Sequence, residues 1–138
     1  MNVFEGTGVK RYALRSRDLP WEPWEYPPDL QFDTVEEALE AQESQVEWYE
    51  VAERFINVRY LPGTEYTPST LLDRLLKLFS LRPYILQTMD GRGWWYTCIS
   101  QMFDTAQAAQ QAAKNGPYRV AAAVLDEHWE PVRKGVYL

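Results

Sequence analysis

The chain has 138 residues, a net charge of -6 and a single cysteine. This length is enough for one domain with its own core, without disulfide bonds or a structural metal. The chain begins without the basic and apolar pattern of an export signal. Its longest apolar-rich stretch, 71–81, includes three charged residues and is far shorter than the roughly 20 residues of a membrane span. We therefore expect a cytoplasmic protein that makes no contact with a membrane.

The acidic residues are concentrated in one segment. Between Asp18 and Glu53 the sequence holds twelve acidic residues and no lysine or arginine, whereas the rest of the chain has a net charge of +6. A surface of one sign attracts and orients partners of the opposite sign. We expect this segment to face a cationic partner, and its charge argues against direct contact with nucleic-acid phosphates.

Two parts of the sequence share one pattern of residues at nearly constant spacing. The first copy holds Tyr12, Leu14, Phe32, Asp33, Thr34, Ala38, Tyr49, Val51 and Ala52; the second holds Tyr84, Leu86, Phe103, Asp104, Thr105, Ala109, Tyr118, Val120 and Ala121. A match of this length at a nearly constant offset indicates a duplicated module.

The first copy predicts a hairpin, a helix and a long strand. The hairpin is its weakest element, because four prolines between residues 20 and 28 cannot donate to a ladder. We expect Asp33 to be the N-cap of the helix, with Glu36 at the N3 position. The strand is expected over residues 49–60, before a turn at Pro62 and Gly63.

Two faces of this helix differ in chemistry. Residues at helical spacing predict an inward stripe made of Val35, Ala38, Leu39, Gln42 and Val46. Glutamates at steps of four and three predict an acidic outer face made of Glu36, Glu40, Glu43 and Glu47. Like charges at this spacing destabilise an isolated helix by a few tenths of a kcal/mol per pair, so the sequence tolerates a small cost along this face.

A leucine-rich helix is expected between the two copies. It begins at Thr67-Pro68 or at Ser69 and ends before Pro83. Its leucines cover more than one face, so we interpret it as a connector that is buried between the modules. The alternative is a helix that binds a second copy or a partner.

The second copy predicts the same elements more clearly. Two β-rich runs surround a turn at residues 90–93, which is typical of a hairpin. A helix follows with Asp104 as the expected N-cap and Gln107 at N3, and Asn115-Gly116 is expected to end it in the left-handed conformation. A strand over 118–125, a turn at 126–127 and a short edge strand over 129–137 complete the copy.

These elements predict an α+β protein made of two tandem ββαβ modules with pseudo-two-fold symmetry. We expect segments 1–66 and 83–138 to be the modules and 67–82 to be the connecting helix. Each module alone is marginal in size for an independent core. We therefore expect one compact domain, built either on two small sheets or on one continuous antiparallel sheet.

Signatures of catalysis, cofactor binding and metal binding are missing from the sequence. His128 is the only histidine and Cys98 the only cysteine; one of each does not make a zinc site. We interpret Cys98 as a small core residue in a strand and His128 as a solvated residue in a turn. We therefore expect neither an enzyme nor a cofactor or metal.

The charge pattern and the aromatic residues favour a protein-binding module. A loop that alternates aromatic, acidic and proline residues lies near the acidic helix, and its tryptophans either bind a partner or fold back over the sheet. Inhibitors that dock on nucleic-acid-binding grooves or toxin active sites work in this way; anti-CRISPR and immunity proteins are comparable in type, although no motif identifies either. The expected partner-binding residues are Glu36, Glu40, Glu43, Glu47, Trp21, Glu22, Trp24 and Glu25.

Three other functions are compatible with the sequence. A small ligand can stack in a cleft between the modules against Trp94, Trp95 or Trp129. The chain can also assemble with itself, as a homodimer or a larger structure, by pairing acidic and basic halves. Finally, the basic residues of the second half can form the binding surface and contact nucleic acid, while the acidic half stays in solvent. These residues are Arg82, Arg92, Lys114, Arg119, Arg133 and Lys134.

Overall fold

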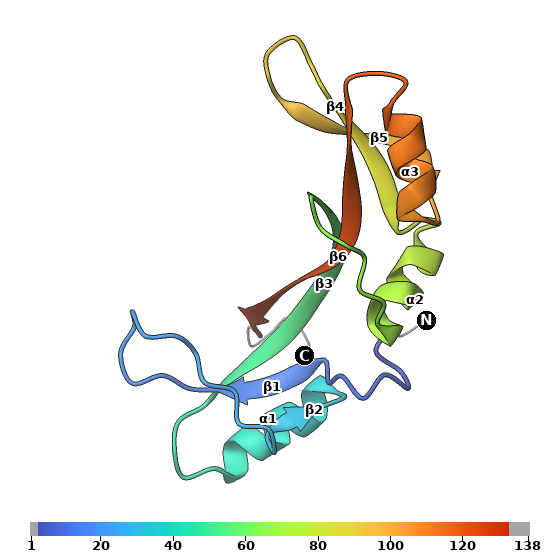
Figure 1. Ribbon diagram of the computed structural model, residues 1–138. Coiled ribbons are helices and arrows are strands. Elements are labelled where there is room, and N and C mark those ends of the chain that lie inside the picture. The colour runs from blue at the N-terminus through green and yellow to red at the C-terminus, as the bar shows by residue number, and fades with distance from the viewer. Residues whose placement is uncertain (1–2, 133–138) are drawn as a thin grey trace. The chain divides into compact units, whose positions relative to one another are not determined.

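The computed structural model describes residues 3–132 and confirms the α+β class. The described part contains three helices and one antiparallel sheet of six strands in the order β2-β1-β3-β6-β4-β5 (Figure 1). The elements in chain order are β1 Tyr12–Arg15, β2 Gln31–Phe32, α1 Val35–Ser44, β3 Glu50–Pro62, α2 Thr70–Leu78, β4 Tyr84–Met89, β5 Trp95–Phe103, α3 Ala106–Ala113 and β6 Tyr118–Pro131.

The chain folds into two compact units. The terminal unit comprises residues 2–56 and 127–138, and the central unit comprises residues 57–126. The long strands β3 and β6 cross these boundaries, so each unit contains a part of both. The division into segments 1–66, 67–82 and 83–138 follows the sequence repeat and stays a prediction.

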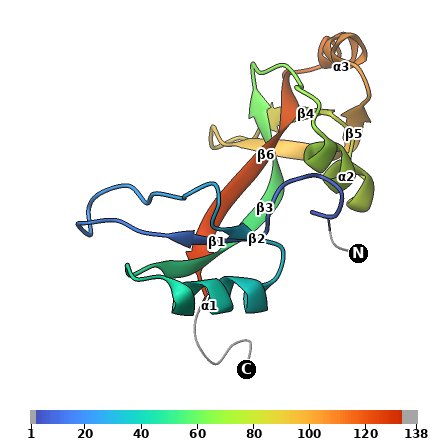
Figure 2. The ribbon, with the colours of Figure 1, turned by 90° about the horizontal axis from the view of Figure 1, so that it is seen from below.

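In the terminal unit, α1 covers one face of β1, β2 and β3 (Figure 2). Leu14 is fully buried and pairs with Val51 on the neighbouring strand. Both side chains pack against Val35 and Ala38 of α1. The apolar residues of the predicted inward stripe thus form this core as far as Ala38, with Leu39 half-buried at its edge.

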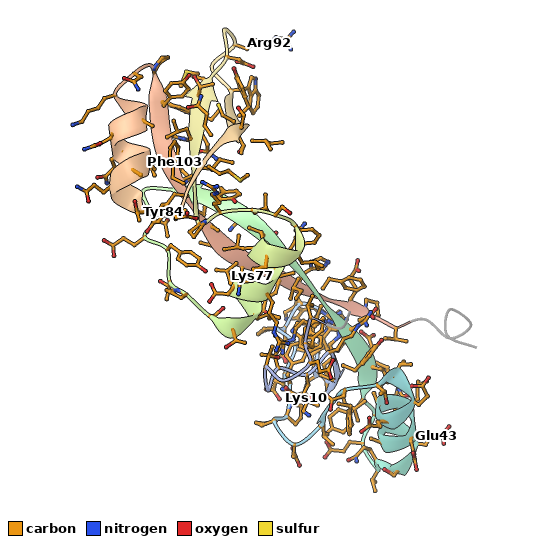
Figure 3. The ribbon with its side chains drawn as sticks, turned by 90° about the vertical axis from the view of Figure 1, so that its right-hand side faces the viewer. Lys10, Glu43, Lys77, Tyr84, Arg92 and Phe103 are labelled. Carbon is orange, nitrogen blue, oxygen red and sulfur yellow. The ribbon has the colours of Figure 1, made fainter. Side chains whose placement is uncertain are left out.

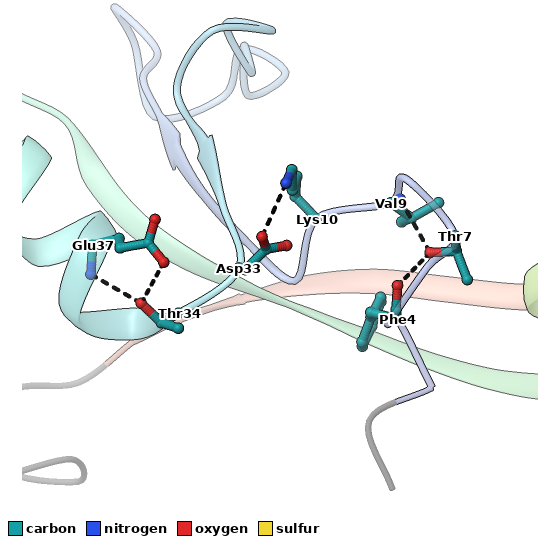
Figure 4. Close-up of polar contacts among 7 residues, drawn as sticks. All are labelled: Phe4, Thr7, Val9, Lys10, Asp33, Thr34 and Glu37. Carbon is teal, nitrogen blue, oxygen red and sulfur yellow. Dashed lines mark hydrogen bonds and ion pairs between the residues drawn. The ribbon is translucent and has the colours of Figure 1, made fainter.

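The first turn of α1 begins one residue later than the sequence analysis expected. Thr34 is the N-cap: its Oγ1 accepts from the Glu37 backbone N–H at 3.2 Å and donates to the Glu37 carboxylate at 2.9 Å (Figure 4). Asp33 instead binds Lys10 at 3.0 Å. In the central unit Thr105, not Asp104, caps α3 by accepting from the Ala108 N–H. The prediction of aspartate caps was wrong because a threonine can make the same bond one residue later.

Thr34→Ala and Thr105→Ala are each expected to lower the free energy of unfolding by about 1 kcal/mol. Each change leaves one backbone N–H of the first helical turn without its acceptor. Asp104→Ala is the control, because Asp104 is exposed and does not cap α3. Urea denaturation followed by circular dichroism measures all three. If Asp104→Ala lowers the free energy of unfolding more than Thr105→Ala does, Asp104 and not Thr105 is the N-cap of α3.

The end of α1 also differs from the prediction. The helix ends at Ser44, so Val46 and Glu47 lie beyond it. Val46 is fully exposed and does not extend the inward stripe. Gln45 adopts an extended conformation and donates its N–H to the Gln42 carbonyl. The helical spacing of apolar residues in the sequence extends to Val46, but the helical backbone ends two residues earlier, at Ser44.

In the central unit, α2 confirms the predicted leucine-rich helix. Ser69 is its N-cap and accepts from the Leu72 N–H at 3.1 Å. Leu72 and Leu76 pack on Ala123 of β6. The helix ends in a Schellman motif, in which Ser80 takes a left-handed φ of 55° and Leu81 donates back to the Leu76 carbonyl.

The hairpin of β4 and β5 is confirmed as well. Asp90 closes its turn by accepting from the Arg92 and Trp94 backbone N–H groups at 2.8 and 3.0 Å. Gly93 supplies the positive φ of 86° that this turn requires. Figure 3 shows Arg92 at the tip of the hairpin and Phe103 at the far end of β5.

Two predicted features of the second copy were wrong. Asn115 and Gly116 do not take the left-handed conformation; Gly116 is needed instead because a Cβ there would lie 2.7 Å from the Tyr118 ring. The strand β6 runs through 126–127 without a turn and ends at Pro131. Residues 133–137 of the predicted edge strand lie outside the described residues. Pro131 has no backbone N–H to donate to a neighbouring strand, which explains why the strand ends there. The two acidic residues at 126–127 were not a reliable signal for a turn.

Repeated residues occupy corresponding positions in the two copies. Leu14 pairs with Val51 in the first copy, and Leu86 pairs with Val120 in the second. The Tyr12–Phe32 pair of the first copy likewise corresponds to a Tyr84–Phe103 pair in the second.

Within residues 3–132, no helix has the length and apolar character needed to cross a membrane.

Candidate partner-binding site

The outer face of α1 carries glutamates that form no ion pair with any residue of the described part of the chain. Glu36, Glu40 and Glu43 are exposed, and within the described residues none of them makes an ion pair. Glu43 lies on the outer side of α1 in Figure 3. Other carboxylates of the acidic segment are paired: Asp33 with Lys10, Glu50 with Arg15 and Glu53 with Arg11. Among the described residues, the outer face of α1 therefore keeps its negative charge.

Residues 45–49, here called the α1–β3 corner, add exposed apolar side chains next to these charges. Val46 is fully exposed and Trp48 is 69% exposed. The Gln42 side chain donates to the Tyr49 carbonyl at 2.7 Å and so ties α1 to the end of the corner. The corner is therefore held to the helix that carries the glutamates.

Tyr49 lies at the end of this corner and contacts one of its carboxylates. Partial burial raises the pKa of its hydroxyl above the ordinary value, and the nearby carboxylates of Glu47 and Asp29 raise it further. Its hydroxyl donates to Glu47 at 3.4 Å. Glu47 thus belongs to the corner and not to the helix face on which it was predicted.

The aromatic loop, residues 17–30, folds back on the terminal unit in part. Backbone hydrogen bonds between Ser16 and Glu25 close its base. The Trp24 ring stacks against two guanidinium groups: its centroid lies 4.1 Å from the Cζ of Arg15 and 4.0 Å from the Cζ of Arg17. Trp21 remains 78% exposed. Of the two predicted loop anchors, only Trp21 is available to a partner without a change in the loop.

The structure does not bring the acidic helix and Trp24 onto one surface. Successive residues of a strand point to opposite faces of a sheet. Leu14 points towards α1, so Arg15 and the Trp24 ring stacked on it lie on the other face. Glu22 and Glu25 belong to the same loop and make no ion pair among the described residues.

Two of the three tryptophans of the alternative ligand site, Trp95 and Trp129, already have partners within the chain. In the central unit, Trp95 lies 4.0 Å below the Arg119 guanidinium, which donates to Gln87. In the terminal unit, Trp129 lies 5.0 Å from the Tyr26 ring and 4.4 Å from the Arg54 guanidinium. Trp94, in contrast, is 72% exposed.

The alternative basic face is also partly engaged. Arg82 lies 3.9 Å from Asp104, and Arg119 is held by Gln87 and Trp95. Lys114 and Arg92 are exposed. Arg133 and Lys134 lie outside the described residues, so this surface can be followed only in part.

The described residues do not assemble a metal site. No group of three or more histidine, cysteine or acidic side chains is placed to hold a metal ion between residues 3 and 132. His128 lies in β6, not in a turn, and stacks on Phe55 with 5.6 Å between ring centroids. Cys98 is half-buried in β5. The expectation of no enzyme stays a prediction.

A surface cavity of about 330 Å³ lies in the terminal unit between the N-terminal loop and the start of α1. Its polar rim includes Lys10 and Asp33, which bind one another, and the loop is braced by the Thr7 hydroxyl, which donates to the Phe4 carbonyl at 2.6 Å (Figure 4). Lys10 and Asp33, two charged residues that line this cavity, thus form an ion pair with each other.

No protein-family model, curated protein or solved structure matches this chain. The candidate site therefore depends on the residues alone. Sequence reasoning located the glutamates of α1 but missed Val46 and Trp48, because Val46 was assigned to the inward stripe and Trp48, just before the expected strand, was given no role in binding. The signal that could have found them is the glutamate-rich run around them, which is hard to bury.

Proposed function

We propose that this chain is a small acidic protein-binding module that docks α1 and the α1–β3 corner on a basic surface of another protein. One observation carries the proposal: glutamates with no ion pair within the described chain lie next to the exposed side chains of Val46 and Trp48. The proposal needs no catalytic residue and no cofactor.

Charge and apolar contact have different roles in this interface. The carboxylates of α1 steer the encounter and set its orientation, which acts mainly on the association rate. A buried tryptophan is a frequent centre of binding energy, which acts mainly on the dissociation rate. Glu40 and Glu43 therefore steer the encounter, and Trp48 is the anchor. Trp21, at the exposed part of the aromatic loop, is a second anchor on a separate part of the surface.

The partner class follows from the charge. A protein surface that attracts an isolated row of carboxylates is rich in lysine and arginine, as in nucleic-acid-binding grooves and the active sites of nuclease toxins. Occupying such a groove excludes the nucleic acid. The module is thus an inhibitor in the manner of anti-CRISPR or immunity proteins, acting in the cytoplasm.

The proposal also includes a duplicated origin for the two ββαβ copies. It is supported by the matching strand pairs of Leu14 and Leu86 and by the matching threonine caps of α1 and α3. The pseudo-two-fold relation between the copies stays a prediction. Only the first copy carries the glutamate face, because α3 contains no acidic residue. Duplication thus supplied a second scaffold that is free to differ in surface chemistry.

The double change Glu40→Gln and Glu43→Gln is expected to slow association with the partner by about ten-fold at low salt, and much less at high salt. The partner is first recovered from the native host with the tagged chain and identified, and stopped-flow fluorescence then measures both rates. Trp48→Ala is expected to raise the dissociation rate with little effect on association.

A matched control changes the net charge by the same amount elsewhere. Glu65→Gln with Asp126→Asn removes two exposed carboxylates from the central unit. This variant is expected to associate at nearly the wild-type rate. If the control and the α1 variant slow association equally, total charge and not this site attracts the partner, and the proposal is wrong.

A further inference from the structure

Large apolar side chains gather on the β4–β5 hairpin of the central unit. Met89, Trp94, Trp95, Tyr96 and Ile99 are all more than a third exposed. The strand β5 is the outer strand of the sheet and pairs only with β4. An exposed strand edge with apolar side chains is a template for pairing with another strand.

The two edges of the sheet are protected differently. At one edge β2 has two residues, which is too short to recruit another strand. At the other edge β5 has nine residues, without a charged residue, proline or glycine. Proteins normally protect an edge with such residues or with a bulge. In β5 a bulge follows Cys98. Leu86 and Ile85 are adjacent on β4, but their partners on β5, Cys98 and Met102, are separated by three residues. The regular, unprotected edge is therefore Trp95–Cys98.

Opposite charges stand at the two ends of β5. Arg92, in the turn before it, is exposed and makes no ion pair within residues 3–132. Asp104, directly after it, has a side chain 76% exposed and a loose contact of 3.9 Å with Arg82. Two antiparallel copies of β5 bring the Arg92 end of each next to the Asp104 end of the other. The residues that flank this strand are therefore complementary in charge to those that flank β5 of a second copy.

We propose that β5 is a self-association surface, through which two copies of this chain pair their β5 edges in antiparallel orientation. The pairing satisfies backbone groups of Trp95–Cys98 and covers the exposed rings of Trp94 and Tyr96. The central unit has five acidic and seven basic residues in sequence, a net charge of +2. Long-range repulsion between two such units is small, in contrast to the terminal unit with its net charge of -8.

The mass of the full chain, measured by sedimentation equilibrium across the micromolar range, tests the proposal. The wild-type chain is expected to pass from monomer to dimer with concentration. Tyr96→Lys places like charges near one another across the paired strands and is expected to raise the dissociation constant of the dimer at least about ten-fold. Trp48→Lys is the matched control, since Trp48 is also an exposed aromatic residue but belongs to the terminal unit; it is expected to leave the dissociation constant unchanged.

Hydrogen exchange supplies a readout that needs no variant. Amides of Trp95–Cys98 are expected to exchange more slowly as the concentration rises, while those of the α1–β3 corner keep their rate. A chain that stays monomeric throughout overturns the proposal and leaves the edge to a strand of another protein. A dimer that Trp48→Lys dissociates and Tyr96→Lys does not also overturns it.

Discussion

Leu86→Ala is expected to lower the free energy of unfolding by about 3 kcal/mol. Leu86 is fully buried in β4 and pairs with Cys98 on one side and Val120 on the other. Truncation removes the apolar contacts of its side chain and leaves a cavity among strands that cannot easily close it. Leu14→Ala, at the corresponding position in the terminal unit, is expected to have a loss of similar size because Leu14 is also fully buried.

Urea denaturation with circular dichroism and tryptophan fluorescence measures this loss. Leu78→Ala is the control, because Leu78 is 49% exposed on α2 and its truncation is expected to cost less than about 1 kcal/mol. Losses below that value for both Leu14 and Leu86 would mean that the paired leucines are not the centres of the two cores.

Arg15→Met is expected to lower the free energy of unfolding by about 2 to 3 kcal/mol. The Arg15 side chain is 6% exposed and forms an ion pair with Glu50. It also donates to the Tyr26 hydroxyl at 3.2 Å and stacks on Trp24. Methionine keeps much of the volume but leaves the Glu50 carboxylate, which is 26% exposed, without its partner. An unpaired, mostly buried charge is costly, so Arg15→Met is expected to lower the free energy of unfolding much more than the loss of a surface ion pair would.

Arg17→Met is the matched control for this experiment. Arg17 stacks on the same Trp24 ring but is exposed and makes no ion pair within residues 3–132. Its loss is expected to cost less than about 1 kcal/mol. Adding Glu50→Gln to Arg15→Met is expected to recover part of the loss, since the unpaired charge of Glu50 is then removed. Equal effects of Arg15→Met and Arg17→Met would show that stacking on Trp24, and not the ion pair, fixes the aromatic loop.

Sequence patterns predicted the elements that depend on neighbouring residues. The hairpin turn at Asp90 and the leucine-rich α2 both follow from local propensity, spacing and turn chemistry. Helix ends were less predictable, because an aspartate and a threonine next to one another offer the same capping bond. The long β6 was missed at residues 126–127, where pairing with neighbouring strands outweighs a local preference of acidic residues for turns.

The candidate site was predicted in composition but not in arrangement. The glutamates of α1 were found because their spacing alone places them on one face. Trp24 was assigned to a partner, although it is held by Arg15 and Arg17 from its own sheet and loop. Such contacts join residues whose side-chain directions depend on how the loop closes, and single-residue preferences carry no information on that closure. The exposure of Val46 and Trp48 depends similarly on the end of α1 at Ser44.

The terminal unit is assembled from both ends of the chain, which has a consequence for biosynthesis. Glu127 binds Arg54 at 2.8 Å, Trp129 lies against Tyr26, and Val132 donates its N–H to the Val51 carbonyl at 2.9 Å. A ribosome that has released only the first hundred residues therefore presents an acidic segment that lacks its last strand. The central unit needs no residue after Asp126, so it can condense before the terminal unit does, and the glutamate-bearing unit receives its last strand only after residues 127–131 have been made.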